Sequence, residues 1–136
     1  TVFIDAPCSG TGTMRRHPEI PWRLTEKDVT VELPKLQLTM LKEAAARVAT
    51  GGELIYATCS VFDEENTQVV DAFLNSPEGT GFSLEPLSEA QILQLPDFEQ
   101  AKKLVAVRQN DRGLFQSVPV NADSYDGHFC ARLVHK

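Results

Sequence analysis

This sequence of 136 residues lacks several common features, and each absence excludes a class of protein or of site. It has no run of about 18 apolar residues, so no segment is expected to cross a membrane. It has only three cysteines, all far apart, so no Cys-x-x-Cys metal or redox signature is present. Basic residues are few: 13 against 19 acidic residues give a net charge of −6, which argues against a protein that grips nucleic acid over its whole surface.

The bulk composition fits one globular domain over residues 1–136, because 42% hydrophobic and 24% charged residues are ordinary values. This length supports a single hydrophobic core and leaves no room for a second full domain. The sparse, odd number of cysteines is typical of a reducing compartment, so a cytoplasmic protein is expected. The histidines and cysteines show no metal-ligand spacing, and no metal is expected.

Two short segments, residues 2–5 and 53–58, are expected to be strands buried on both faces of a parallel sheet, because both are short apolar runs rich in β-formers. A helix between them begins at Pro34, which suits a first helical position, and ends at Gly51-Gly52. Apolar residues at spacings of three, four and three mark its buried face: Leu38, Leu41, Ala45 and Val48.

Weaker signals predict the other elements of the first half. Residues 14–33 carry two prolines and no clear periodicity, which indicates a long irregular loop, a kind of segment that is often functional. A second helix is expected over about 63–75, where Ser60 and Asp63 have capping-box spacing. Strand, helix, strand, helix in this order predicts parallel strands with right-handed crossovers, and therefore an α/β fold.

The second half is harder to interpret. Residues 82–84 have the character of a short strand, and residues 87–104 are expected to contain helix. Two strand-like segments, residues 113–118 and 128–134, are joined by a polar turn, which predicts an antiparallel hairpin.

Two of the cysteines follow the predicted parallel strands directly. Cys8 lies three residues beyond Asp5, and Cys59 is the first residue after the second strand. Adjacent strands lie about 4.8 Å apart. Both thiols should therefore meet in one crevice at the carboxyl ends of the strands, where open α/β sheets bind ligands. We expect Cα atoms within the disulfide range of about 4.4–6.8 Å or a few Å beyond it.

Each of these residues also has an ordinary structural interpretation. Cys59 precedes a predicted helix N-terminus, whose partial positive charge favours a nucleophilic thiolate, but a lone buried cysteine is more often inert. Asp5 ends its strand, where a carboxylate can face a ligand or simply hydrogen-bond to the turn. The pairing of the two thiols is what favours a functional role.

Two motifs resemble those of a known family. Residues 5–12 (DAPCSGTG) and 57–66 (ATCSVFDEEN) are similar to the two cysteine motifs of the NOP/Sun-type RNA cytosine-5-methyltransferases. The likeness runs nearly continuously over residues 1–76 and returns over 113–134. Three further segments contribute to it: residues 15–22 (RRHPEIPW), 36–41 (LQLTML) and 126–133 (DGHFCARL).

The resemblance implies a role for each matching residue. Cys59 is expected to attack carbon-6 of the target cytosine, and Cys8 to help release the methylated product. Asp5 is expected to bond the cytosine edge and to lie close to the cofactor, S-adenosyl-methionine. Pro7 would shape the backbone around the flipped base and contact the cofactor. Glu65 and Asn66 match the family pattern as well, but we interpret them as helix-start residues.

The resemblance also implies a Rossmann-like class I methyltransferase sheet of seven strands, of which this chain is expected to supply the latter four as the C-terminal part of the catalytic domain. The cofactor loop is expected upstream, and Gly10–Thr13 is not that loop. We expect this chain alone to bind the cofactor weakly at most, without turnover, and to self-associate through the exposed edge of its first strand. Ribosomal RNA is the favoured substrate, ahead of transfer RNA.

A basic cluster offers an RNA contact within an otherwise acidic chain. Arg15, Arg16 and Arg23 surround Trp22 in the loop after Cys8, and are expected to bind phosphates while the ring stacks on a base. The alternative is a solvated loop whose arginines pair with Glu19 or Glu26. The third cysteine, Cys130, is expected to be a core residue.

Three other functions stay open from the sequence. A DNA cytosine-5-methyltransferase would use Cys8, in its Pro-Cys motif, as the nucleophile. A thiol redox protein would use Cys8 and Cys59 as a pair, with no need for Asp5 or the arginines. A catalytically silent RNA-binding or assembly domain is the third.

Overall fold

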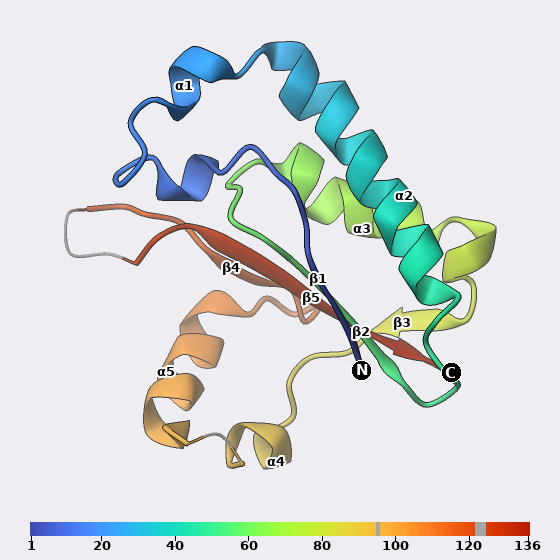
Figure 1. Cartoon of the computed structure of the whole chain (residues 1–136). Coiled ribbons are helices and arrows are strands. Elements are labelled where there is room, and N and C mark those ends of the chain that lie inside the picture. The colour runs from blue at the N-terminus through green and yellow to red at the C-terminus, as the bar shows by residue number, and fades with distance from the viewer. Residues whose placement is uncertain (95, 122–124) are drawn as a thin grey trace.

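The computed structural model describes residues 1–94, 96–121 and 125–136, which form one five-stranded sheet with helices on both faces (Figure 1). The strands are β1 (Val2–Asp5), β2 (Glu53–Thr58), β3 (Phe82–Leu84), β4 (Phe115–Ser117) and β5 (His128–His135). Their order is β1-β2-β5-β3, with β4 also paired to β5. The α/β fold expected from the sequence is confirmed, and each of the five strands lies within or close to a segment that the sequence predicted, although the family resemblance implied four strands.

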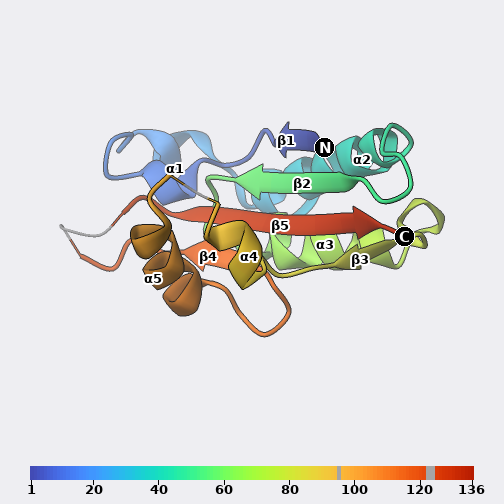
Figure 2. The same ribbon diagram turned by 90° about the horizontal axis from the view of Figure 1, so that it is seen from below.

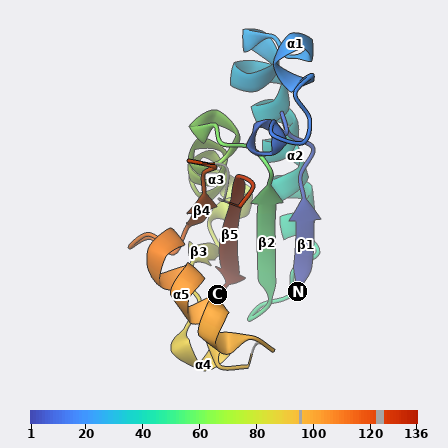
Figure 3. The ribbon, with the colours of Figure 1, turned by 90° about the vertical axis from the view of Figure 1, so that its left-hand side faces the viewer.

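The sheet combines a parallel pair with antiparallel additions. β1 and β2 run parallel, whereas β5 is antiparallel to β2, β3 and β4 (Figure 3). The predicted C-terminal hairpin is therefore confirmed. β3 runs in the same direction as β2 but does not pair with it, because β5 occupies the place between them.

Helices α2 (Leu33–Ala45) and α3 (Thr67–Leu74) cover one face of the sheet, and α4 (Glu89–Ile92) and α5 (Phe98–Arg108) lie on the other (Figure 2). The core lies under α2 and α3. Its largest apolar members are Leu41, Leu54, Tyr56, Val70, Phe73, Phe129 and Leu133, each at most 1% exposed. Among the described residues, no helix is long and apolar enough to cross a membrane.

The expected burial of the strands on both faces is wrong. Along β2, buried residues alternate with half-buried ones, so only the face under α2 and α3 is dry. On the edge strand β1 the contrast is stronger, since Ile4 is 7% exposed and Phe3 64%. Apolar residues on both faces of these strands therefore do not mean that both faces are fully covered by other parts of the protein.

The expected irregular loop over residues 14–33 contains helical structure. It includes α1 (Ile20–Arg23) and a π-helical segment (Asp28–Glu32) that continues directly into α2. A reciprocal cap starts this helix: the Thr25 backbone N–H donates to the Asp28 carboxylate at 2.9 Å, and the Asp28 N–H donates back to the Thr25 hydroxyl at 3.2 Å. The helix therefore begins well before Pro34.

Two glycines bring the loop after β1 against the start of β5. Gly12 donates its N–H to the Cys59 carbonyl at 2.8 Å, and Gly127 donates to the Gly12 carbonyl at 2.8 Å. A Cβ atom on Gly12 would lie only 2.1 Å from the Gly127 oxygen. Glycine is required at position 12 because three backbone segments approach one another there.

We expect Gly12→Ala to destabilise the protein by about 1–3 kcal/mol, because the added methyl group must push backbone atoms apart. Gly51→Asn is the matched control: no atom lies within 4 Å of a Cβ there, and asparagine tolerates its positive φ of 78°. Urea unfolding of both variants measures the difference. Equal midpoints for the two variants would contradict the close-packing explanation.

Candidate active site

The two parallel strands bring the cysteine loops together. β1 and β2 are in register up to Asp5 and Ala57, and the Ala6 N–H extends the ladder by donating to the Ala57 carbonyl at 2.9 Å. The Sγ atoms of Cys8 and Cys59 lie 3.4 Å apart, in hydrogen-bonding contact. Both thiols are free and half-buried. The expected convergence of the two thiols is confirmed.

The Cys8 thiol is held in its protonated form. Burial raises the pKa of Cys8 to about 12, the backbone at Gly10 opposes this shift, and the contact with Cys59 raises the pKa further. At neutral pH, Cys8 therefore keeps its proton and can donate it in a hydrogen bond to the Cys59 sulfur.

Cys59 does not precede a helix N-terminus, and the helix-dipole argument for it is wrong. After Cys59 the chain makes a 3₁₀ turn (Asp63–Glu65) and then breaks at Asn66, so that α3 begins only at Thr67. The expected cap between Ser60 and Asp63 is also absent, because the Ser60 hydroxyl donates to the Glu65 carboxylate at 2.5 Å instead.

Asp5 and Cys59 line one cavity of about 450 Å³ at the edge of the sheet. Asp5 is exposed at the end of the edge strand, and Arg16 reaches the same cavity from the loop after β1. The remaining lining residues are Phe3, Thr13, Ala57, Thr58, Phe115, His128, Phe129 and Cys130.

Cys130 is not the core residue that the sequence suggested. It is half-buried, pairs in register with Ala57, and lines the cavity of Cys59. Neighbouring Phe129 and Ala131 are at most 1% exposed, so alternation along β5 turns Cys130 to the face away from α2 and α3. Burial raises the pKa of its thiol.

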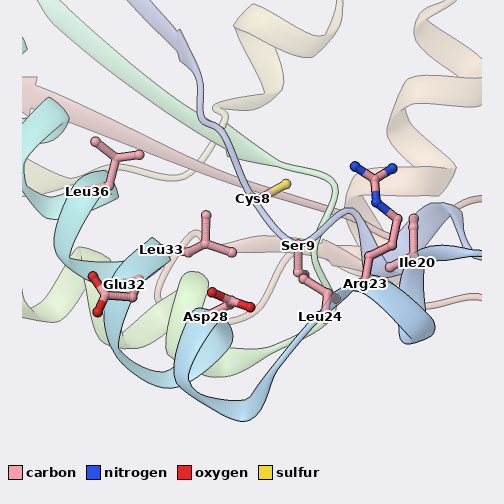
Figure 4. Close-up of a pocket in the computed structure, with 9 residues that line it drawn as sticks. All are labelled: Cys8, Ser9, Ile20, Arg23, Leu24, Asp28, Glu32, Leu33 and Leu36. Atoms are coloured by element: carbon pink, nitrogen blue, oxygen red, sulfur yellow. The ribbon is translucent and has the colours of Figure 1, made fainter.

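Cys8 lines a second cavity, of about 680 Å³, to which Cys59 does not contribute (Figure 4). Arg23 of α1 extends into this cavity, and the carboxylates of Asp28 and Glu32 lie in its wall. The single shared crevice expected from the sequence is therefore wrong in detail: the thiols touch, but each lines its own cavity. The two acidic residues were not identified from the sequence.

The basic cluster adjoins the site and is tied to β5. Arg15 and Arg16 form ion pairs with Asp126, at 3.4 and 2.5 Å. Trp22 is 90% exposed. Arg16 and Arg23 line one thiol cavity each, and the pairing of Arg15 and Arg16 with Asp126 holds the loop against the segment just before β5.

Glu65 and Asn66 have a larger structural role than the helix start assigned to them. Both are 0% exposed and hydrogen-bonded beneath the cysteine loops. A helical-wheel projection of the sequence could have indicated this burial. Glu65 and Asn66 lie four positions before Val69 and Val70, which are buried in α3. Within the described part of the chain, no group of three or more His, Cys, Asp or Glu residues could hold a metal ion.

A family model described as 16S rRNA methyltransferase RsmB/F matches residues 1–134. The chain belongs to this family. The two cysteine motifs are thus those of an RsmB/F sequence, in accordance with the resemblance found in the sequence.

Relatives of known name agree with the RsmB/F family. The ribosomal RNA small subunit methyltransferase B of Escherichia coli K12 is 36% identical over 135 residues, which are 99% of this chain and 26% of that protein. The protein of the same name from Citrobacter koseri is 41% identical over 100 residues, 73% of this chain and 23% of that protein. The chain therefore spans about a quarter of the length of the curated relatives it matches.

Solved structures share the fold. The crystal structure of PH0851 matches 98% of this chain and 26% of that chain, with a TM-score of 0.73 and 36% identity. NSun6 from Pyrococcus horikoshii, solved with SFG, has a TM-score of 0.68 over 98% of this chain and 29% of that chain. At 21% identity, the second likeness supports the fold alone.

We expect alkylation of Cys8 by iodoacetamide to rise about tenfold per pH unit from pH 7 to 10, without a plateau. The reason is that only the thiolate reacts, and a pKa of about 12 keeps the thiolate a minor species over this whole range. Peptide-level mass spectrometry separates Cys8 from the other two cysteines. A plateau near pH 8.5–9, as for an unperturbed thiol, would refute the raised pKa.

Proposed function

We propose that this chain carries the two catalytic cysteines of an RNA cytosine-5-methyltransferase that acts on small-subunit ribosomal RNA. The observation that carries the proposal is the 3.4 Å contact between Cys8 and Cys59 at the ends of two parallel strands, in a member of the RsmB/F family. The description of the family and the names of its relatives support ribosomal RNA ahead of transfer RNA.

Cys59 is assigned as the nucleophile. Its sulfur adds to carbon-6 of the cytosine, and the electrons of the carbon-5–carbon-6 double bond move into the ring, which makes carbon-5 nucleophilic. Asp5, exposed in the same cavity, bonds the polar edge of the base and stabilises this activated ring. Once carbon-5 carries the methyl group, solvent water takes its remaining proton and the carbon-5–carbon-6 double bond re-forms. The carbon-6–sulfur bond then breaks, and its electron pair returns to Cys59.

Cys8 is assigned to this release step. A thiol that keeps its proton at neutral pH can donate a hydrogen bond to the neighbouring sulfur. That hydrogen bond is strong when Cys59 departs as a thiolate and weak when Cys59 is the neutral thioether of the adduct, so it stabilises the departing sulfur. The raised pKa of Cys8 therefore suits the second half of the reaction.

S-adenosyl-methionine is the cofactor that this assignment requires, and when bound it supplies the methyl group. The residues present fit one part of it. Asp5 presents an exposed carboxylate to a cavity of about 450 Å³, which suits the ammonium group of the cofactor. We assign cofactor contacts to Asp5 and, through its backbone, to Pro7, whose carbonyl is fixed by a hydrogen bond from Gln37 at 2.9 Å.

The alternatives lose support. The family match favours RNA over DNA, and with it Cys59 over Cys8 as the nucleophile. A dedicated redox protein would not explain Asp5 and Arg16 beside the same thiol. The expected self-association through β1 stays a prediction, supported by the 64% exposure of Phe3 on that edge strand.

In the complete protein, Cys59→Ala should abolish methylation and the covalent RNA adduct, because no sulfur remains to attack carbon-6. Cys8→Ala should instead accumulate the adduct, because the departing sulfur loses its hydrogen-bond donor. Denaturing gels with labelled RNA detect the adduct, and each variant serves as the control for the other. An adduct in Cys59→Ala and none in Cys8→Ala would reverse the two roles.

The arginine pair gives a separate test of RNA binding. Arg15→Ala combined with Arg16→Ala should weaken binding and flatten the dependence of log K on log salt by about 0.7 for each phosphate that the two arginines neutralise. Asp126→Asn removes the carboxylate that both arginines pair with while keeping their charges, so it should retain the salt slope. Filter binding from 50 to 300 mM salt measures all three proteins. An unchanged slope in the double variant would show that the two arginines do not neutralise RNA phosphates.

A further inference from the structure

Glu65 is a fully buried carboxylate that the reaction above does not use. It is 0% exposed, and the three donors named below that its carboxylate binds are not the two thiols. It accepts hydrogen bonds from three separate parts of the chain: from the Ser9 backbone N–H at 2.8 Å, from the Gln37 side-chain amide at 3.1 Å, and from the Ser60 hydroxyl at 2.5 Å. A buried carboxylate is costly unless donors of this kind surround it.

Two of these donors come from the residues next to the cysteines. Ser9 follows Cys8 and Ser60 follows Cys59, so one carboxylate holds the neighbour of each thiol. The two serines are also linked directly, because the Ser9 hydroxyl donates to the Ser60 hydroxyl at 3.1 Å. Both loops are therefore fastened to the same point, beneath the sulfur atoms.

Gln37 of α2 gives the third attachment and reaches the other neighbour of Cys8. Its Nε2 donates both to Glu65 and to the Pro7 carbonyl, the latter at 2.9 Å. In the part of the chain that the structure describes, its buried Oε1 has no hydrogen-bond partner. The amide is therefore oriented by its two donated bonds, and Cys8 is held on both sides, at Pro7 and at Ser9.

We propose that Glu65 is a positioning residue that sets the spacing of Cys8 and Cys59. Parallel pairing of β1 and β2 brings the two loops to one edge of the sheet, but the ladder ends at Asp5, Ala6 and Ala57. Beyond that point the Glu65 carboxylate joins the two loops by accepting from the neighbours of both cysteines. Three further bonds link the same loops: Gly12 to Cys59, Ser9 to Ser60, and Val61 to Thr11. That this spacing of Cys8 and Cys59 serves catalysis rests on the proposed function. That Glu65 sets the spacing does not depend on it.

The test measures the spacing without any methylation assay. In a glutathione redox buffer the two thiols and oxidised glutathione give one protein disulfide and two reduced glutathione molecules, and the equilibrium constant reports how closely the thiols are held. Peptide mass mapping identifies the Cys8–Cys59 disulfide. We expect Glu65→Gln, which keeps the shape but replaces an acceptor oxygen with a donor, to lower this constant at least tenfold in the complete protein.

Tyr56→Phe is the matched control. Its buried hydroxyl donates to the Glu65 backbone carbonyl at 2.6 Å, so this variant removes a bond of Glu65 and leaves the carboxylate in place. It should lose stability to urea but keep the wild-type thiol equilibrium. Equal thiol equilibria in Glu65→Gln and wild type, or an equal loss in Tyr56→Phe, would overturn the proposal. If Glu65→Gln does not fold, Ser60→Ala takes its place with the same expected loss; it removes the hydroxyl that donates to Glu65 and that accepts from Ser9 and from the Phe62 N–H.

A second measurement separates this proposal from the proposed function. If both hold, Glu65→Gln in the complete protein accumulates the covalent RNA adduct, because a displaced Cys8 no longer assists release. A shifted thiol equilibrium with no methylation by the wild-type protein would refute the proposed function and leave the positioning role standing. Methylation by the wild type with an unshifted thiol equilibrium in Glu65→Gln would refute the positioning role alone.

Discussion

Parallel, in-register pairing of β1 with β2 is the constraint on which the rest of the site depends. The pairing of the two strands ends at Asp5 and Ala57, so the loops that follow leave the sheet from neighbouring points and in the same direction. The contact of the thiols, the two cavities beside them and the buried carboxylate beneath them all lie beyond that shared end. A shift of one residue between the strands would turn Asp5 to the opposite face and separate the two sulfur atoms.

The two cysteines touch, but their surroundings differ. Cys8 is desolvated, and its raised pKa keeps the proton in place. Cys59 lies in contact with it and lines a cavity that also holds a carboxylate and a guanidinium, those of Asp5 and Arg16. A pair of identical side chains can thus divide a reaction between attack and release, because their surroundings and not their chemistry differ.

The parts of this structure that follow from local rules could be predicted from the sequence. The strands, the C-terminal hairpin and the meeting of Cys8 with Cys59 all follow from hydrophobic runs and the geometry of parallel crossovers. The start of the long helix lies before Pro34 because Thr25 and Asp28 form the cap, and apolar periodicity and proline preference carry no signal for that cap. Burial of Glu65 was missed for another reason: a charged residue is normally exposed, and only tertiary donors make its burial tolerable. The division of the site into two cavities depends on side-chain packing, which the spacing of residues along the sequence does not predict.

The position of β5 has a consequence for how this chain folds. It is the last strand in the chain, yet it lies between β2 and β3, and the glycine just before it is the one on which the loop after β1 rests. The strands made earlier therefore cannot close their sheet by themselves, and pairs as distant as Glu53 and Val134 must find each other. Such long sequence separations slow folding. The hydrogen bond between Gly127 and Gly12 and the ion pairs of Arg15 and Arg16 with Asp126 can form only after the segment before β5 has been made, so the loop after β1 gains these anchors late.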